Sequence, residues 1–230
     1  MNEILSQSIF FGIAITLVTY EIGLWIKQKP GKAIANPLLI SVILIVAVLL
    51  LFHIDYETYA NGAQYISIFL TPATVSLAVP LYRQLELLKT YPKAIFGGII
   101  AGVLTAMVSV FALSLMFGLS HEQYVTLLPK SITTAIGMGI SEKMGGIVTI
   151  TVVVIIVTGI LGNILAETIC HLCKIEDPIA KGLAIGTSAH ALGTAKAMEL
   201  GEIEGAMSSL SIVVCGILTV ISVSIFANFI

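Results

Sequence analysis

Three short polar segments interrupt a chain that otherwise consists of long apolar stretches. They lie at 70–80, 128–137 and 186–196, and each combines helix-breaking proline or glycine with serine or threonine hydroxyls. Backbone that leaves its helix at membrane depth is tolerated only where it is buried in protein or lines a wet cavity. The pattern therefore predicts broken helices or re-entrant loops around a solute pathway, as in a secondary transporter.

The composition indicates an integral membrane protein. Of the 230 residues, 57% are apolar and 10% are charged, and the mean hydropathy is +1.05. Five stretches are long and apolar enough to span a bilayer: Ile4–Ile26, Pro37–Ile54, Ala94–Leu119, Gly145–Ile169 and Gly205–Ile230. Weaker segments near 62–82, 123–141 and 178–198 contain the polar interruptions. We predict an all-α membrane protein with about seven or eight hydrophobic segments in one domain, 1–230.

Two further patterns concern topology. If all eight segments cross the bilayer, eight lysines and arginines share one side and only Lys174 and Lys181 face the other, which places the first group in the cytoplasm. A single re-entrant hairpin would reverse every later segment. The similarity of 72–80 to 129–137 also predicts an internal repeat, with halves at about 1–120 and 121–230.

Lys130 is the strongest candidate for chemistry. It follows Pro129 and precedes Ser131, Thr133 and Thr134. An ammonium at membrane depth is costly, so it should face a cavity or a partner, where it would attract an anion while the hydroxyls hydrogen-bond a carboxylate. The alternative is an interfacial lysine that extends toward water from a shallow segment.

His190 is the second candidate. It lies among Thr187, Ser188 and Thr194, and its neutral ring can both donate and accept hydrogen bonds. It could bind a substrate carboxylate or hydroxyl, or carry a proton near physiological pH. The alternative is a structural hydrogen bond.

The first segment supplies Thr74 and Ser76 between Pro72 and Pro80, where unpaired carbonyls and hydroxyls could contact a solute. Three charged residues, Arg83, Glu21 and Lys196, are candidates for gating or proton transfer, with anchoring at the membrane surface as the alternative. Neither a carboxylate pair, a metal cluster, a phosphate-binding loop nor a nucleophile motif is present, so we predict no enzyme, no metal and no cofactor. The net charge of −2 argues against nucleic acid as a partner.

Several of these motifs occur together in one family. The stretches 36–39, 72–83, 128–134, 145–146, 180–195 and 204–209 run in order along nearly the whole chain. In them, the chain resembles the LrgB/CidB family of bacterial membrane proteins, and Lys130, His190 and Gly193–Lys196 resemble CidB more than LrgB.

The resemblance implies a multi-pass protein of the bacterial plasma membrane with one of two functions. One is holin- or antiholin-like control of murein hydrolase activity and lysis, together with a small LrgA/CidA-type membrane partner. The other is carrier-mediated transport of small monocarboxylates of the pyruvate, lactate, glycolate or glycerate class, with indirect effects on lysis. Because a hole has no need of broken helices that carry Lys130 and His190, the residues favour the carrier, which we expect to be a homo-oligomer, most simply a dimer.

Overall fold

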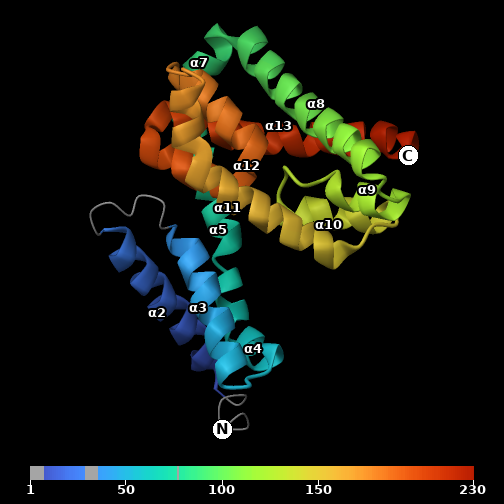
Figure 1. The fold of residues 1–230 in the computed structure, drawn as a ribbon. Helices are drawn as coiled ribbons and strands as arrows, with labels where there is room; N and C mark the ends of the chain where they lie inside the picture. Colours follow the sequence, from blue (N-terminus) through green and yellow to red (C-terminus); the bar gives the residue numbers. More distant parts are fainter. Residues whose placement is uncertain (1–7, 29–35, 77) are drawn as a thin grey trace. The chain divides into compact units, whose positions relative to one another are not determined.

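The computed structural model describes residues 8–28, 36–76 and 78–230, and these residues form helices and connecting turns without strands. The chain divides into two compact units, 1–76 and 77–230 (Figure 1). Five helical stretches are long and apolar enough to cross a membrane: 10–27, 56–83, 92–117, 148–172 and 202–229. The prediction of an all-helical membrane protein is therefore confirmed.

The described residues of the smaller unit form four helices, and polar contacts join three of them. The helices are α2 (Ile9–Lys27), α3 (Pro37–Leu51), α4 (Tyr56–Ser67) and α5 (Leu70–Ser76). The hydroxyls of Thr19 in α2 and Ser41 in α3 lie 2.8 Å apart, and those of Thr16 in α2 and Tyr59 in α4 lie 3.0 Å apart. These hydrogen bonds join α2 to both neighbours in a unit that has little other polar surface to bury.

The larger unit is built on three long helices with shorter elements between them. Its elements are α6 (Ala78–Arg83), α7 (Leu85–Thr90), α8 (Pro92–Phe117), α9 (His121–Leu127), α10 (Thr134–Lys143), α11 (Val148–Leu172), α12 (Pro178–Leu200), α13 (Glu202–Phe226) and η1 (Ala227–Phe229). At 1.5 Å per residue, the 25 or 26 residues of α8, α11 and α13 each exceed the roughly 30 Å of a bilayer core. These three helices form the frame of the unit.

The helix α12 is a hairpin rather than a straight rod. Its backbone is non-helical at His190, where φ is 43° and ψ is −136°. A methyl group on Gly182 would meet Glu204 and one on Gly186 would meet Ser208, whereas Met198 lies against Gly205 and Thr194 against Ser208. The residues before His190 therefore run parallel to α13 and those after it run antiparallel, so the chain reverses at His190.

The elements α9 and α10 form a second hairpin at the opposite end of the frame, as Figure 1 shows. The ring nitrogen Nδ1 of His121 lies 2.6 Å from the carbonyl oxygen of Ile230, at the end of the chain. The hydroxyl of Ser141, in the returning arm, lies 2.7 Å from that of Thr151, near the start of α11. Both arms of this hairpin thus reach the same end of the larger unit. The turn between them, at 128–133, lies inside the unit.

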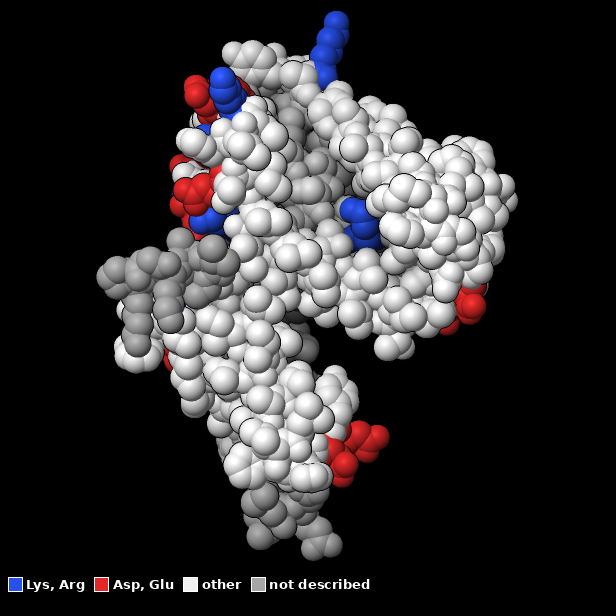
Figure 2. Space-filling view, viewed as in Figure 1, with Lys and Arg blue, Asp and Glu red and all other residues white. Residues whose placement is uncertain are grey.

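Two of the predicted interrupted segments are therefore re-entrant, and the assumption that all eight segments cross is wrong. Because 121–143 and 178–200 each return to the end at which they start, Lys174 and Lys181 lie at the same end as Lys93, and Lys143 lies at the other. Figure 2 shows charged side chains gathered at the end of the larger unit that holds the base of α12. The predicted interruptions at 128–137 and 186–196 are confirmed, and the parity derived from eight crossings is wrong.

Candidate functional site

A cavity of about 940 Å³ opens in the larger unit between α8, the first arm of α12 and the tip of the α9–α10 hairpin. Figure 2 shows basic atoms inside a hollow on this face. Its polar lining consists of Tyr91, Thr105, Ser109, Lys130, Ser131, Asp177, Thr187 and Ser188. The remaining lining residues are small or aliphatic, so a few polar groups stand in an apolar wall, as is typical of small-molecule sites.

Lys130 lies at the tip of the α9–α10 hairpin because the helix cannot continue there. Pro129 lacks a backbone N–H, and the turn is closed by the Lys130 N–H, which donates to the carbonyl oxygen of Leu127 at 3.2 Å. The Lys130 ammonium donates to the Ser131 hydroxyl at 2.9 Å and lines the cavity. An ammonium makes up to three hydrogen bonds, so two donors stay available for a bound anion.

The opposite wall comes from the first arm of α12. Thr187 donates to the carbonyl oxygen of Leu183 at 2.8 Å and Ser188 donates to that of Ala184 at 2.7 Å. Each hydroxyl donates its only proton to a carbonyl of its own helix, so it can only accept a hydrogen bond from a ligand in the cavity. This wall accepts hydrogen bonds, whereas Lys130 donates them.

A close helix contact fixes the width of the cavity. A methyl group on Gly102 of α8 would lie 2.7 Å from Cβ and Oγ1 of Thr187, and one on Gly98 would lie 3.1 Å from the side chain of Leu183. The absence of a side chain at these glycines lets α8 approach the first arm of α12 along its length. The small-residue face of α8 thus packs within the subunit.

His190 supports the tip of α12 and is not among the residues that line the cavity. Its side chain is 4% exposed, and Nε2 lies 3.1 Å from the carbonyl oxygen of Ile155 in α11. A carbonyl only accepts, so Nε2 carries the proton in this contact. A positive φ is uncommon for a residue with a side chain, and its neighbours hold it in place. The geometry matches the structural alternative considered for His190.

Thr194 belongs to the same support. Its hydroxyl donates to the carbonyl oxygen of His190 at 2.9 Å and lies 2.7 Å from the hydroxyl of Ser208, and both side chains are fully buried. Since Thr194 has one proton, Ser208 donates in the second contact. The pair therefore joins the second arm of α12 to α13.

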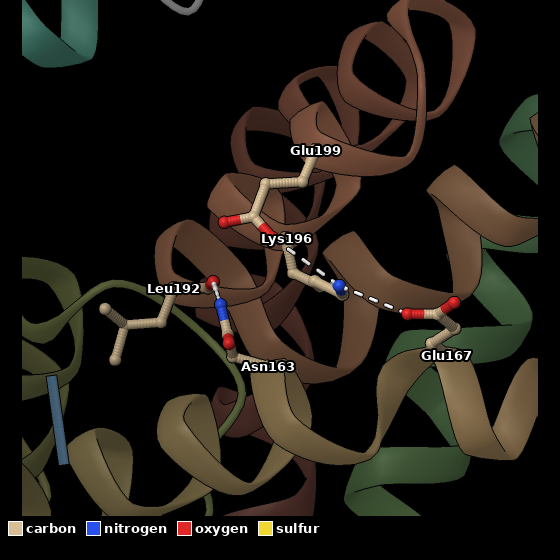
Figure 3. Close-up of polar contacts among 5 residues, drawn as sticks. All are labelled: Asn163, Glu167, Leu192, Lys196 and Glu199. Atoms are coloured by element: carbon tan, nitrogen blue, oxygen red, sulfur yellow. Dashed lines mark hydrogen bonds and ion pairs between the residues drawn. The ribbon is translucent and has the colours of Figure 1, made fainter. Parts of the chain in front are cut away.

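Figure 3 shows the contacts that hold the second arm of α12 on α11. Asn163 donates from Nδ2 to the carbonyl oxygen of Leu192 at 2.7 Å. The ammonium of Lys196 lies 3.2 Å from Glu167 Oε2 and 3.5 Å from Glu199 Oε2. Lys196 therefore bridges two acidic side chains at the base of the hairpin instead of facing the cavity.

The structure brings four of the predicted binding residues together and distributes the others. Lys130, Ser131, Thr187 and Ser188 line the cavity. Thr133 is the N-cap of α10 and Thr134 is its first residue. Arg83 lies 3.8 Å from Glu202, with both side chains largely exposed.

The smaller unit holds the remaining predicted residues. Glu21 is exposed on α2, and Ser76 donates to the carbonyl oxygen of Ala73 at 2.6 Å. Thr74 lies in α5, and its side chain is outside the described residues. The convergence of the first polar segment with the other two stays a prediction.

Sequence reasoning missed Thr105 and Ser109 of α8 and Asp177, the N-cap of α12. The signal was present. Gly98, Gly102, Thr105 and Ser109 recur every three or four residues and so share one helix face. The two hydroxyls continue the face on which the two glycines lie.

These observations define a multi-pass helical membrane protein with two re-entrant hairpins and a cavity whose apolar wall carries a few polar groups. The chain belongs to the LrgB-like family, whose family model matches residues 16–229. Antiholin-like protein LrgB from Bacillus cereus strain B4264 is 37% identical over 222 residues, which cover 96% of each chain, and its namesake from Bacillus anthracis strain CDC 684 matches to the same extent. No solved structure matches the chain.

The comparisons confirm the predicted family and the membrane location. The name antiholin-like favours the holin- or antiholin-like alternative over carboxylate transport. The family is not one of enzymes.

Proposed function

We propose that this protein is a membrane carrier for small monocarboxylates and that it influences lysis through the balance of these metabolites. The observation that carries the proposal is the position of Lys130, a cation at a helix break inside a cavity. Among the residues that line this cavity, Lys130 is the one basic side chain. One ammonium suits one carboxylate better than a dianion.

A carrier also needs a route to the site from each side. The α9–α10 hairpin and the α12 hairpin start at opposite ends of the larger unit. Each follows a long helix, α8 or α11, and these two helices run in opposite directions. We propose that α8 with α9–α10 and α11 with α12 are inverted repeats, and that movement of the two hairpins gives alternating access.

The basic residues orient the unit. Among the described residues of the larger unit outside the cavity, one end holds Arg83, Lys89, Lys93, Lys174, Lys181 and Lys196, and the other holds Lys143. Positive charge is retained on the cytoplasmic side of bacterial membranes. The base of α12 is therefore cytoplasmic in this proposal, and the base of α9–α10 lies on the opposite side.

The second candidate is an antiholin-like protein that regulates murein hydrolase activity with an LrgA/CidA-type partner. The names of the relatives support it. In this case the cavity would stabilise an assembly, either with that partner or in a homo-oligomer such as a dimer, instead of holding a solute. The two candidates differ in whether the purified protein alone moves a carboxylate.

Reconstitution in liposomes separates the candidates. We expect saturable uptake of radiolabelled lactate or pyruvate by the purified protein, without leakage of neutral or cationic solutes of similar size. Lys130→Ala should reduce uptake roughly 10- to 100-fold, because a charge-assisted hydrogen bond contributes about 1.5–3 kcal/mol. Lys143→Ala, an exposed lysine at the end of α10, is the matched control and should leave uptake unchanged.

Two results would overturn the carrier. One is unselective leakage, which indicates a hole. The other is the absence of saturable uptake in protein that is correctly folded by circular dichroism and gel filtration. Normal uptake by Lys130→Ala would instead show that the carboxylate binds elsewhere.

A further inference from the structure

Two hydroxyls of α8 line the cavity and take no part in holding helices together. Thr105 donates to the carbonyl oxygen of Ala101 at 2.7 Å, and Ser109 donates to that of Thr105 at 2.7 Å. Both bonds lie within α8, and both side chains line the cavity with Lys130. A hydroxyl that serves neither packing nor a contact between helices, yet faces a cavity, is available to a ligand.

The protons of these hydroxyls are already committed, which determines what they offer. With its one proton given to a backbone carbonyl, each hydroxyl presents only lone pairs to the cavity. Thr187 and Ser188 on the opposite wall are in the same state. The cavity therefore combines one strong donor, the Lys130 ammonium, with acceptors on both helical walls.

Thr105 and Ser109 lie beyond Gly102 along α8, in the wall of the cavity that Lys130 also lines. Gly102 marks where α8 contacts Thr187, and the helix continues from there toward the end from which the α9–α10 hairpin enters. Thr105 and Ser109 follow Gly102 by one and two turns. They therefore lie on the part of the α8 wall between the Gly102–Thr187 contact and the end from which the hairpin that carries Lys130 enters.

A ligand that complements this arrangement carries a carboxylate at one end and a hydrogen-bond donor beside it. We propose that Thr105 and Ser109 are specificity-determining residues that accept a hydrogen bond from a hydroxyl group of the carried acid. A 2-hydroxy monocarboxylate is then preferred over an acid of the same size that lacks the hydroxyl. This inference rests on the proposed carrier function.

Lactate and propionate provide the test, because they share the carbon chain and the charge and differ by one hydroxyl. In liposomes containing the wild-type protein, unlabelled lactate should inhibit labelled lactate uptake at roughly ten-fold lower concentration than propionate does. Because the ligand hydroxyl donates one hydrogen bond, the Thr105→Val, Ser109→Ala double variant should reduce this ratio about five-fold, and each single variant should reduce it by no more than that. Propionate uptake itself should stay close to that of the wild type, which also shows that the variants fold.

Two controls isolate the effect to the cavity. Thr105→Ser restores the acceptor and should restore the ratio. Ser114→Ala removes a hydroxyl from the same helix, where the side chain is buried and does not line the cavity, and should leave the ratio unchanged.

An unchanged ratio in the Thr105→Val, Ser109→Ala double variant would overturn the inference. So would a wild-type protein that does not distinguish the two acids. Saturable, Lys130-dependent propionate uptake would in either case leave the carrier function intact. Loss of saturable uptake of both acids by the wild-type protein would overturn the carrier function and this inference together.

Discussion

The two hairpins of the larger unit are attached to the long helices at opposite places, one near its base and the other at its tip. The α9–α10 hairpin is fixed near its base, where the hydroxyl of Thr151 lies 2.7 Å from that of Ser141 and 2.9 Å from the carbonyl oxygen of Thr126, and all of these groups are buried. The α12 hairpin is fixed at its tip by His190 and Thr194, while its base is held by the Lys196–Glu167 ion pair.

The contacts that attach the two hairpins differ in how much free energy is needed to break them. Buried hydrogen bonds are costly to break because the separated groups would lack partners, whereas an ion pair with an exposed carboxylate exchanges readily with water. The tip of α9–α10, which carries Lys130, projects from a rigid base. The tip of α12 is attached to α11 and α13 through buried hydrogen bonds, and the ion pair at its base adds little to this attachment.

The largest effect on stability should come from crowding the tip of α12. A methyl group at Gly159 would lie 2.8 Å from Cε1 of His190 and 2.7 Å from the side chain of Leu192. Gly159→Ala should therefore lower the free energy of unfolding by about 2–3 kcal/mol, as overpacking of a core does. The control is Gly97→Ala, since a methyl group there meets nothing within 4 Å. Equal unfolding curves for the two variants in detergent would show that the tip of α12 is not an anchor.

A smaller effect is expected at the base of α9–α10. Thr151→Val keeps the shape of the side chain and removes the hydroxyl between Thr126 and Ser141, which should cost about 1–2 kcal/mol. Thr149→Val changes an exposed residue, the second of α11, and serves as the control. If Thr151→Val destabilised the protein more than Gly159→Ala, the assignment of the stronger anchor to the α12 tip would be wrong.

The smallest effect on the free energy of unfolding is expected at the base of α12. Glu167 is largely exposed, so Glu167→Gln should change the free energy of unfolding by less than about 1 kcal/mol. The small difference should disappear in high salt, where exposed charges are screened. A large loss of stability that persists in salt would show that the base is as firmly fixed as the tip and would remove the contrast between the hairpins.

Much of this architecture could be predicted from composition and helix breakers. The apolar stretches predicted the positions of α8, α11 and α13, because about twenty consecutive apolar residues usually form a membrane-spanning helix. Pro129 and the glycines around His190 located the breaks. Whether the chain passes through a break or turns back depends on one pair of dihedral angles, such as φ 43° at His190, and residue types do not determine that angle.

The lysine and the hydroxyls that the two hairpins contribute to the candidate site were predicted, and the hydroxyls that α8 contributes were not. Lys130 and Ser131 are local in sequence and conspicuous because a charge in an apolar segment is costly. Thr105 and Ser109 sit in an unbroken apolar helix and acquire a role only because Gly102 lets Thr187 approach. Contacts of that kind depend on tertiary packing, and a single sequence carries no direct record of them.

The re-entrant hairpins have a consequence for assembly. A hairpin that returns to its starting side adds no crossing, so α8, α11 and α13 leave the larger unit with an odd number of passages through the bilayer. The connection before α8 and Ile230 therefore face different compartments. With the base of α12 on the cytoplasmic side, as proposed above, a second domain fused behind Ile230 would be synthesised into the compartment away from the cytoplasm. Two such units joined directly in tandem would be inserted upside down relative to each other.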